Sequence, residues 1–138
     1  MDAGYKHDLS IVGSPSFKEK IKEILSLIKA ADYYDFLRTY IRKISEVGGL
    51  SQLREAEATI WLSDIIAGKP CEGARFVVQK AEQMKSYIDG KEYYIRGERS
   101  AVAKSVIFLE KLVNSIEDET MRVKCEDTLR QWREAKIV

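Results

Sequence analysis

An apolar side chain recurs at every third or fourth position along most of this chain, and this spacing is typical of amphipathic helices. The clearest case follows Ser14-Pro15-Ser16, because proline tolerates the first turn of a helix and serine caps it. Beyond that start, one stripe collects the apolar residues Phe17, Ile21, Ile24, Leu25 and Ile28. We therefore predict that a helix begins here and buries this stripe.

The same spacing predicts further helices, which are separated by glycines, a proline and capping side chains. One begins near Asp32 and ends at Gly48, three cover residues 51–67, 74–87 and 98–115, and the last begins near Asp118. Apolar residues spread widely around 51–67, so we expect this helix to be central. We predict one shared core that contains Leu53, Ile60, Trp61, Leu62, Val106, Leu109 and Leu129.

Only residues 87–96 carry a hairpin signal, because Asp89-Gly90 lies between aromatic and β-branched residues. A tight loop is the alternative, since an isolated hairpin is marginal. Residues 1–13 lack helical periodicity and predict a flexible N-terminal tail. Together these patterns predict an all-α, or mainly α, fold: one helical domain over 1–138, built as a compact bundle of five to six helices with at most one small β-hairpin near residues 87–96.

Charge and composition limit the function less than they limit the fold. The 138 residues are 45% hydrophobic, which is enough for one ordinary core, and 23 Lys and Arg against 22 Asp and Glu leave a net charge of +1. Any binding to nucleic acid must therefore use a local basic patch. We find neither a secretory signal nor an apolar run long enough to span a membrane, and we expect a cytoplasmic protein without a membrane partner.

No constellation of residues specifies a reaction. The one histidine, His7, lies in the expected tail, and Gly48-Gly49 is not followed by the Gly-Lys-Ser/Thr of a phosphate-binding loop. Acidic residues such as Glu55 and Glu57 are mostly adjacent or two apart, so on a helix they point in different directions. Cys71 and Cys125 lack metal-ligand spacing and are expected to be packed or free thiols. We predict a protein that is not an enzyme and holds no metal or cofactor.

Basic residues interleaved with aromatic ones are the remaining chemical signal, because phosphates bind the cations and bases stack on the rings. The alternative is that these cations only make the helices soluble while the tyrosines pack. Our candidate nucleic-acid-binding residues are Arg38, Arg42, Lys43, Lys91, Tyr93, Tyr94, Arg96, Arg99 and Lys104.

Residues 44–68 are apolar and acidic by contrast, and they favour contact with a protein partner, although burial within a crowded bundle would also explain them. The candidate partner-binding residues are Arg54, Glu55 and Glu57. Ile107 and Phe108 also lie off the main stripe of their helix and could contribute to such a contact.

The phrase Gly48-Gly49-Leu50-Ser51-Gln52-Leu53-Arg54-Glu55-Ala56-Glu57, with the small size and helical pattern, resembles the small subunit of archaeal type I-A CRISPR interference complexes. The resemblance implies a helical, non-catalytic component of a ribonucleoprotein. Its implied partners are the backbone subunits, further copies of itself, and single-stranded DNA or the crRNA–target duplex, bound weakly. The competing hypothesis is a helical protein-interaction or homo-oligomerisation module that binds no nucleic acid.

Overall fold

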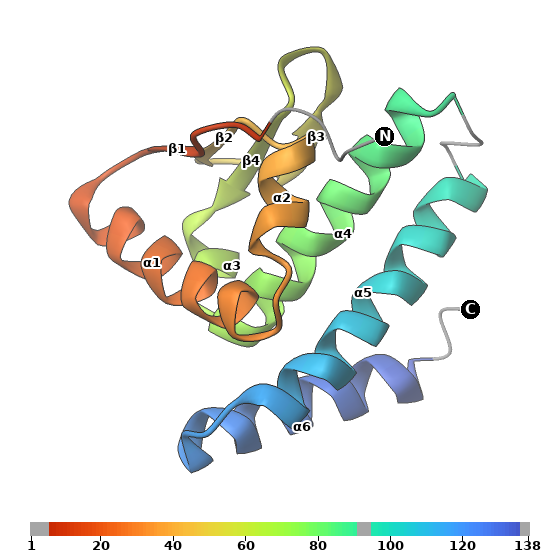
Figure 1. Ribbon diagram of the computed structural model, residues 1–138. Helices are drawn as coiled ribbons and strands as arrows, with labels where there is room; N and C mark the ends of the chain where they lie inside the picture. The colour runs from red at the N-terminus through yellow and green to blue at the C-terminus, as the bar shows by residue number, and fades with distance from the viewer. Residues whose placement is uncertain (1–5, 91–94, 136–138) are drawn as a thin grey trace.

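A sheet and a set of helices form two layers in the computed structural model, which describes residues 6–90 and 95–135 (Figure 1). The strands are β1 (Ser10–Val12), β2 (Lys43–Val47), β3 (Gln52–Arg54) and β4 (Thr59–Ser63), and a 3₁₀ turn, η1 (Glu55–Glu57), joins the last two. The helices are α1 (Pro15–Ala30), α2 (Tyr34–Tyr40), α3 (Asp64–Ala67), α4 (Pro70–Ile88), α5 (Ile95–Ser115) and α6 (Glu119–Glu134).

The four strands lie in the order β1-β2-β4-β3. Strands β1, β2 and β4 are parallel, whereas β3 runs antiparallel to β4 and forms one edge. In register, Ile11 pairs with Ile44, and Ile44 pairs with Ile60. Because side chains alternate between the faces of a strand, these residues share one face, which the helices cover.

The main core lies between that face and the helices. Ile44, Ile60 and Leu62 are fully buried there together with Phe17 and Ile21 of α1. Helix α4 lies against α1, α2 and α5, and α6 crosses one end of α5 on the side away from the sheet (Figure 1). The central helix is therefore α4, whose buried residues run from Cys71 to Met84.

The prediction of an all-α bundle is wrong, because residues 51–67 form β3, η1, β4 and α3 instead of one helix. Ala58 adopts the left-handed conformation, with φ of 50°, which a continuous helix cannot contain. After it, residues 59–63 place Ile60 and Leu62 in the core and Trp61 on the opposite side. This alternation has the period of a strand, and pairing with β2 and β3 completes it.

The helix predicted between Asp32 and Gly48 is also too long. Asp32 has a left-handed backbone, with φ of 63°, and does not cap α2, which ends at Tyr40. The residues that follow enter β2, where Ile44 lies in the centre of the parallel sheet. Ile41 and Ile44 are three residues apart, as on one face of a helix, so their spacing favoured a continuous helix over the break after Tyr40.

The hairpin near residues 87–96 is likewise wrong where the chain is described. Helix α4 continues to Ile88, Gly90 provides a left-handed residue with φ of 70° after it, and α5 begins at Ile95. Residues 91–94 lie outside the described residues. The expected tail over 1–13 is partly ordered, because residues 10–12 form β1 and pair with β2; residues 1–5 are not described.

Four predicted helices are confirmed, namely α1, α4, α5 and α6. Ser14 caps α1 by accepting a hydrogen bond from the Phe17 amide, and Asp118 caps α6 in the same way. Of the predicted core, Leu53, Ile60, Leu62, Leu109 and Leu129 are buried and Val106 is partly buried against them. Phe108, for which both partner contact and burial within the bundle were open, is fully buried, whereas Ile107 is exposed. No helix in the described ranges has the length and apolar character needed to cross a bilayer.

Replacing Leu62 with alanine should lower the free energy of unfolding by about 2–5 kcal/mol, because the substitution removes buried methyl groups and leaves a cavity. Leu62 is fully buried in β4. Denaturant unfolding would measure the loss. Leu50→Ala is the matched control, since that side chain is 84% exposed and should change stability little. Equal stability of the two variants would contradict the placement of Leu62.

Candidate nucleic-acid interface

The face of the sheet that the helices leave uncovered carries no acidic residue. Register and alternation place on it the residues Ser10, Val12, Lys43, Ser45, Val47, Gln52, Arg54, Thr59, Trp61 and Ser63. All of these are exposed or half-buried except Thr59, which is buried. We call this surface the outer face. It contains two cations and one large aromatic ring, so its local charge differs from the nearly neutral charge of the whole chain.

Two rows cross the outer face. Arg54 pairs with Thr59, Thr59 with Lys43, and Lys43 with Ser10, so the two cations lie in one row with β4 between them. The next row contains Trp61, which pairs with Gln52 on one side and Ser45 on the other. Neighbouring strands lie about 4.8 Å apart. The Lys43 and Arg54 backbones are two strands apart and are therefore separated by about 10 Å in total.

Trp61 therefore does not belong to the core in which we predicted it. Its ring lies under the Arg54 guanidinium, at 4.4 Å from the guanidinium carbon to the ring centroid, in a cation–π contact. A planar base could stack on this guanidinium or take its place over the ring. Arg54, predicted to bind a partner, thus lies on the outer face, whereas Glu55 and Glu57 follow it in η1.

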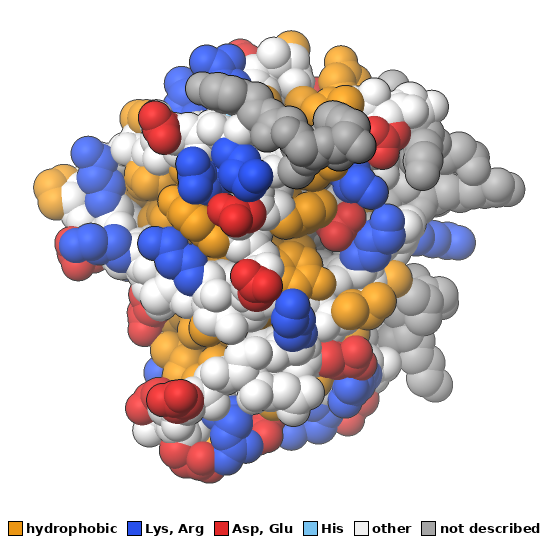
Figure 2. Space-filling view, viewed as in Figure 1, with side chains coloured by type: hydrophobic (Ala, Val, Ile, Leu, Met, Phe, Trp, Pro, Cys, Tyr) orange, Lys and Arg blue, Asp and Glu red, His pale blue; other side chains and the backbone are white. Residues whose placement is uncertain are grey.

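Of the first predicted basic cluster, Arg38, Arg42 and Lys43, the structure brings all three to one end of the sheet. Arg38 Nε donates to the backbone oxygen of His7, while the His7 amide donates to the Arg38 oxygen. Burial, and then the charge of Arg42, lower the pKa of His7, so its imidazole is neutral at pH 7. Figure 2 shows Lys and Arg side chains gathered beside α2 near the top, whereas cations and acids alternate at the bottom, around α6.

Of the second predicted cluster, the structure describes only the side chains of Arg99 and Lys104, and these lie on α5 and not on the outer face. Lys91, Tyr93 and Tyr94 lie outside the described residues, and for Arg96 only the backbone is described, in the first turn of α5. Arg99 and Lys104 also belong to α5, which packs mainly on α4 and α6. Lys104 lies 3.8 Å from a carboxylate oxygen of Glu82, an ion pair that explains its position without a ligand.

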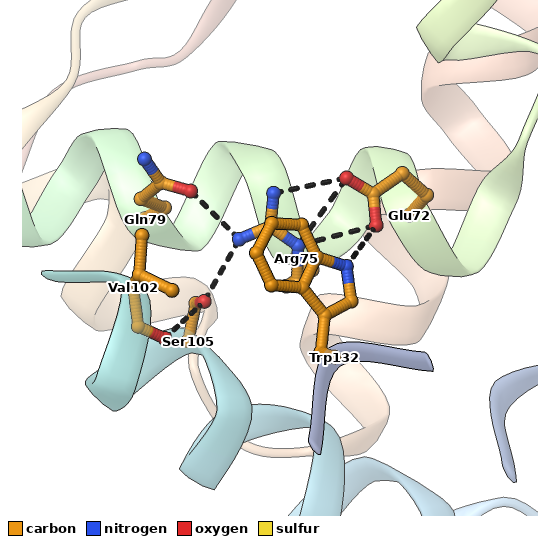
Figure 3. Close-up of polar contacts among 6 residues, drawn as sticks. All are labelled: Glu72, Arg75, Gln79, Val102, Ser105 and Trp132. Carbon is orange, nitrogen blue, oxygen red and sulfur yellow. Dashed lines mark hydrogen bonds and ion pairs between the residues drawn. The ribbon is translucent and has the colours of Figure 1, made fainter. Parts of the chain in front are cut away.

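The strongest polar cluster lies elsewhere, between α4, α5 and α6, and sequence reasoning missed it (Figure 3). Its centre is Arg75, whose side chain is only 3% exposed. The guanidinium donates to Glu72 (Nη2 to Oε2, 2.9 Å), to Gln79 Oε1 (2.7 Å) and to Ser105 Oγ (2.9 Å). The Trp132 ring covers the guanidinium, with 3.7 Å between the guanidinium carbon and the ring centroid. Its indole N–H donates a hydrogen bond to Glu72 Oε1 at 2.7 Å.

This Arg75 cluster ties three helices together. Its hydrogen bonds satisfy the buried charge, and the Ser105 hydroxyl donates a hydrogen bond to the Val102 backbone oxygen. Beside it, Cys71 and Cys125 form a disulfide between α4 and α6, so the prediction of packed or free thiols is wrong. The two cysteines are far apart in sequence, and only the packing of α6 on α4 brings them together. The cluster and the disulfide serve structure first.

The described residues hold no group of three or more His, Cys, Asp or Glu side chains suited to a metal ion. Comparisons with protein-family models, with curated proteins and with solved structures return no match to this chain.

The substitution Glu72→Gln should destabilise the protein by about 1–3 kcal/mol, because it removes the negative partner of a buried guanidinium. The lower end of the range applies if water reaches the site, since the Glu72 side chain is 27% exposed. Thermal unfolding would measure the loss. Glu126→Gln is the control, because it weakens a surface ion pair with Arg122 and should change stability little. If both variants unfold alike, the cluster does not hold the helices together.

Proposed function

We propose that this protein is a non-catalytic component that binds single-stranded nucleic acid weakly through the outer face of its sheet. The observation that carries the proposal is the composition of that face, where Lys43, Arg54 and Trp61 lie together without an acidic residue. The cations would contact phosphates and the ring would receive a base. Neither interaction reads sequence, so we expect binding without strong sequence preference.

The neighbouring cations extend this surface beyond the sheet. Arg42 directly precedes Lys43 and is exposed. Arg38 lies four residues before Arg42, in the last turn of α2. The distance between the two cations suits an extended single strand of nucleic acid that crosses β2 and β4. Its phosphates would lie near the cations and one base would lie over Trp61. Electrostatic attraction of this kind weakens steeply as salt rises, because binding releases counterions from the nucleic acid.

The protein is expected to work within a larger assembly. A chain of net charge +1 offers few phosphate contacts, so affinity would rise when neighbouring subunits extend the basic surface. The small subunit of an archaeal type I-A CRISPR complex stays a prediction of this kind. The residues of that resemblance form a loop, the edge strand β3 and η1, so they do not supply the helical architecture it implied. The proposal accordingly rests on the outer face.

A cytoplasmic location belongs to this proposal as well. Disulfides are rare in reducing compartments, with the intracellular proteins of hyperthermophiles as the exception. The Cys71–Cys125 bond is therefore compatible with a cytoplasmic protein of a heat-adapted host.

A protein-interaction function is the second candidate, and exposed apolar residues at the other end of the sheet favour it. Val12 is 50% and Ile65 is 75% exposed, and both line a hollow of about 450 Å³ where β1, β2 and β4 end. Leu50, 84% exposed, belongs to the loop after β2. If this end joins copies of the chain, Ile65→Lys should convert oligomers to monomers in sedimentation equilibrium; a wild type that is monomeric at every concentration would exclude self-association.

To test the nucleic-acid function, a fluorescent oligothymidine should be titrated with the wild type and with the double variant Lys43→Gln/Arg54→Gln. We expect micromolar or weaker binding, as for non-specific complexes, and a double variant whose slope of log K against log salt is flatter by about 1.4, or about 0.7 for each lost phosphate contact. Trp61→Ala should cost about 1–3 kcal/mol of binding free energy through lost stacking. Anisotropy measures both effects.

A matched control removes the same charge elsewhere. Lys18→Gln/Lys124→Gln takes away two exposed cations on α1 and α6, so it changes the net charge equally but leaves the outer face intact. Circular dichroism should show that all variants fold. Equal loss of binding in the two double variants would reduce the effect to net charge, and undiminished binding by Lys43→Gln/Arg54→Gln would overturn the proposed function.

A further inference from the structure

A second concave surface lies beside the Arg75 cluster. It is a groove of about 590 Å³, within the range of small-molecule sites, and it lies between α4, α5 and the side chain of Trp132. The residues that matter for its chemistry are Arg75, Phe76, Lys80, Arg99, Val102 and Trp132. We call it the α4–α5 groove.

Two cations of the groove are available to a ligand. Arg75 is already neutralised by Glu72, but Lys80 and Arg99 form no ion pair within the described chain. Lys80 is half-buried, and its ammonium lies 5.0 Å from the centroid of the Phe76 ring. Burial lowers the pKa of Lys80, because removal from water disfavours the charged form; Glu98 and Glu55 oppose this effect and Arg75 adds to it.

The acids of the groove do not cancel this charge. Its lining contains Glu72, which serves Arg75 and Trp132, and Glu98, which is exposed on the first turn of α5. Among the lining residues three cations face two carboxylates, and Glu55 acts on Lys80 from outside the lining. An anion placed between Lys80 and Arg99 would restore the solvation that burial removes from the ammonium.

The apolar part of the groove is aromatic. Phe76 and Trp132 line it, and the aliphatic Val102 lies with them. A ligand with an anionic group and a flat ring would satisfy both the cations and the rings, whereas a simple inorganic anion would use only the cations. We propose that the α4–α5 groove binds a small phosphate ester of a planar heterocycle, for which a mononucleotide is the simplest example.

This site is independent of the proposed function, because it shares no residue with the outer face. The groove uses α4, α5, α6 and Ser51 of the loop before β3, whereas the outer face uses only strands. Loss of one kind of binding therefore leaves the other in place, and substitutions can separate them.

The test is a calorimetric titration of the full chain with adenosine monophosphate, adenosine, ribose 5-phosphate and inorganic phosphate as separate probes. We expect adenosine monophosphate to bind with Kd below about 1 mM and at least about tenfold more tightly than any other probe, because only it contacts both cations and rings. Lys80→Gln and Arg99→Gln should each weaken its binding at least about fivefold, as expected when one charge-assisted contact is lost.

Two controls keep the test decisive. Lys104 lies on α5 like Arg99, but it pairs with Glu82 and does not line the groove. The Lys104→Gln variant should therefore bind adenosine monophosphate like the wild type. In the variant Trp61→Phe, Trp132 is the remaining tryptophan, and its fluorescence should change on binding. Adenosine monophosphate that binds no better than phosphate, or binding unchanged by both Lys80→Gln and Arg99→Gln, would overturn the assignment.

Discussion

The packing of α4 is the interaction on which the rest of the structure depends. Its apolar side chains face α1 on the sheet side and α5 on the other, so one helix belongs to both halves of the molecule. The close approach is visible at Gly73, where an added Cβ would lie 2.5 Å from the Ile24 side chain. Without α4 the sheet layer would lose part of its cover, and the α5–α6 pair would lose its main contact with the rest of the molecule.

The same helix explains why function divides between two surfaces. On the sheet side, helices cover the inner face completely, and the outer face is left to solvent with Lys43, Arg54 and Trp61 on it. On the far side, polar residues of α4 meet α5 and α6 around Arg75, and the α4–α5 groove opens next to them. Both surfaces therefore follow from the burial of α4, whose apolar residues pack toward the sheet layer and whose polar residues meet α5 and α6.

Sequence periodicity predicted the long helices well and the sheet badly, for a physical reason. Phe17, Ile21 and Ile24 form a stripe that only a helix can bury, and α1 confirms it. Ile60 and Leu62, in contrast, belong to a strand of five residues, too short for its alternation to outweigh the apolar residues around it. Parallel pairing with β2 is a contact distant in the sequence, so no local pattern announces it.

The candidate sites show the same division. Arg38, Arg42 and Lys43 are neighbours in sequence, and the structure keeps them together. Arg54 and Trp61 approach across a strand pair, and Glu72, Arg75 and Trp132 across three helices, so tertiary packing alone assembles them. A buried arginine at position 75 could be suspected only from its place on a stripe of otherwise small and apolar residues.

The Cys71–Cys125 bond gives the chain an unequal response to mechanical force. The bond joins residues 54 positions apart, and all of α5 lies between them. A load applied at the two ends of the chain would pass directly from α4 to α6 through the sulfur atoms. The sheet and α1 would extend, whereas the loop that contains α5 would carry no tension until the bond is reduced, so reduction would lengthen the extensible part of the molecule.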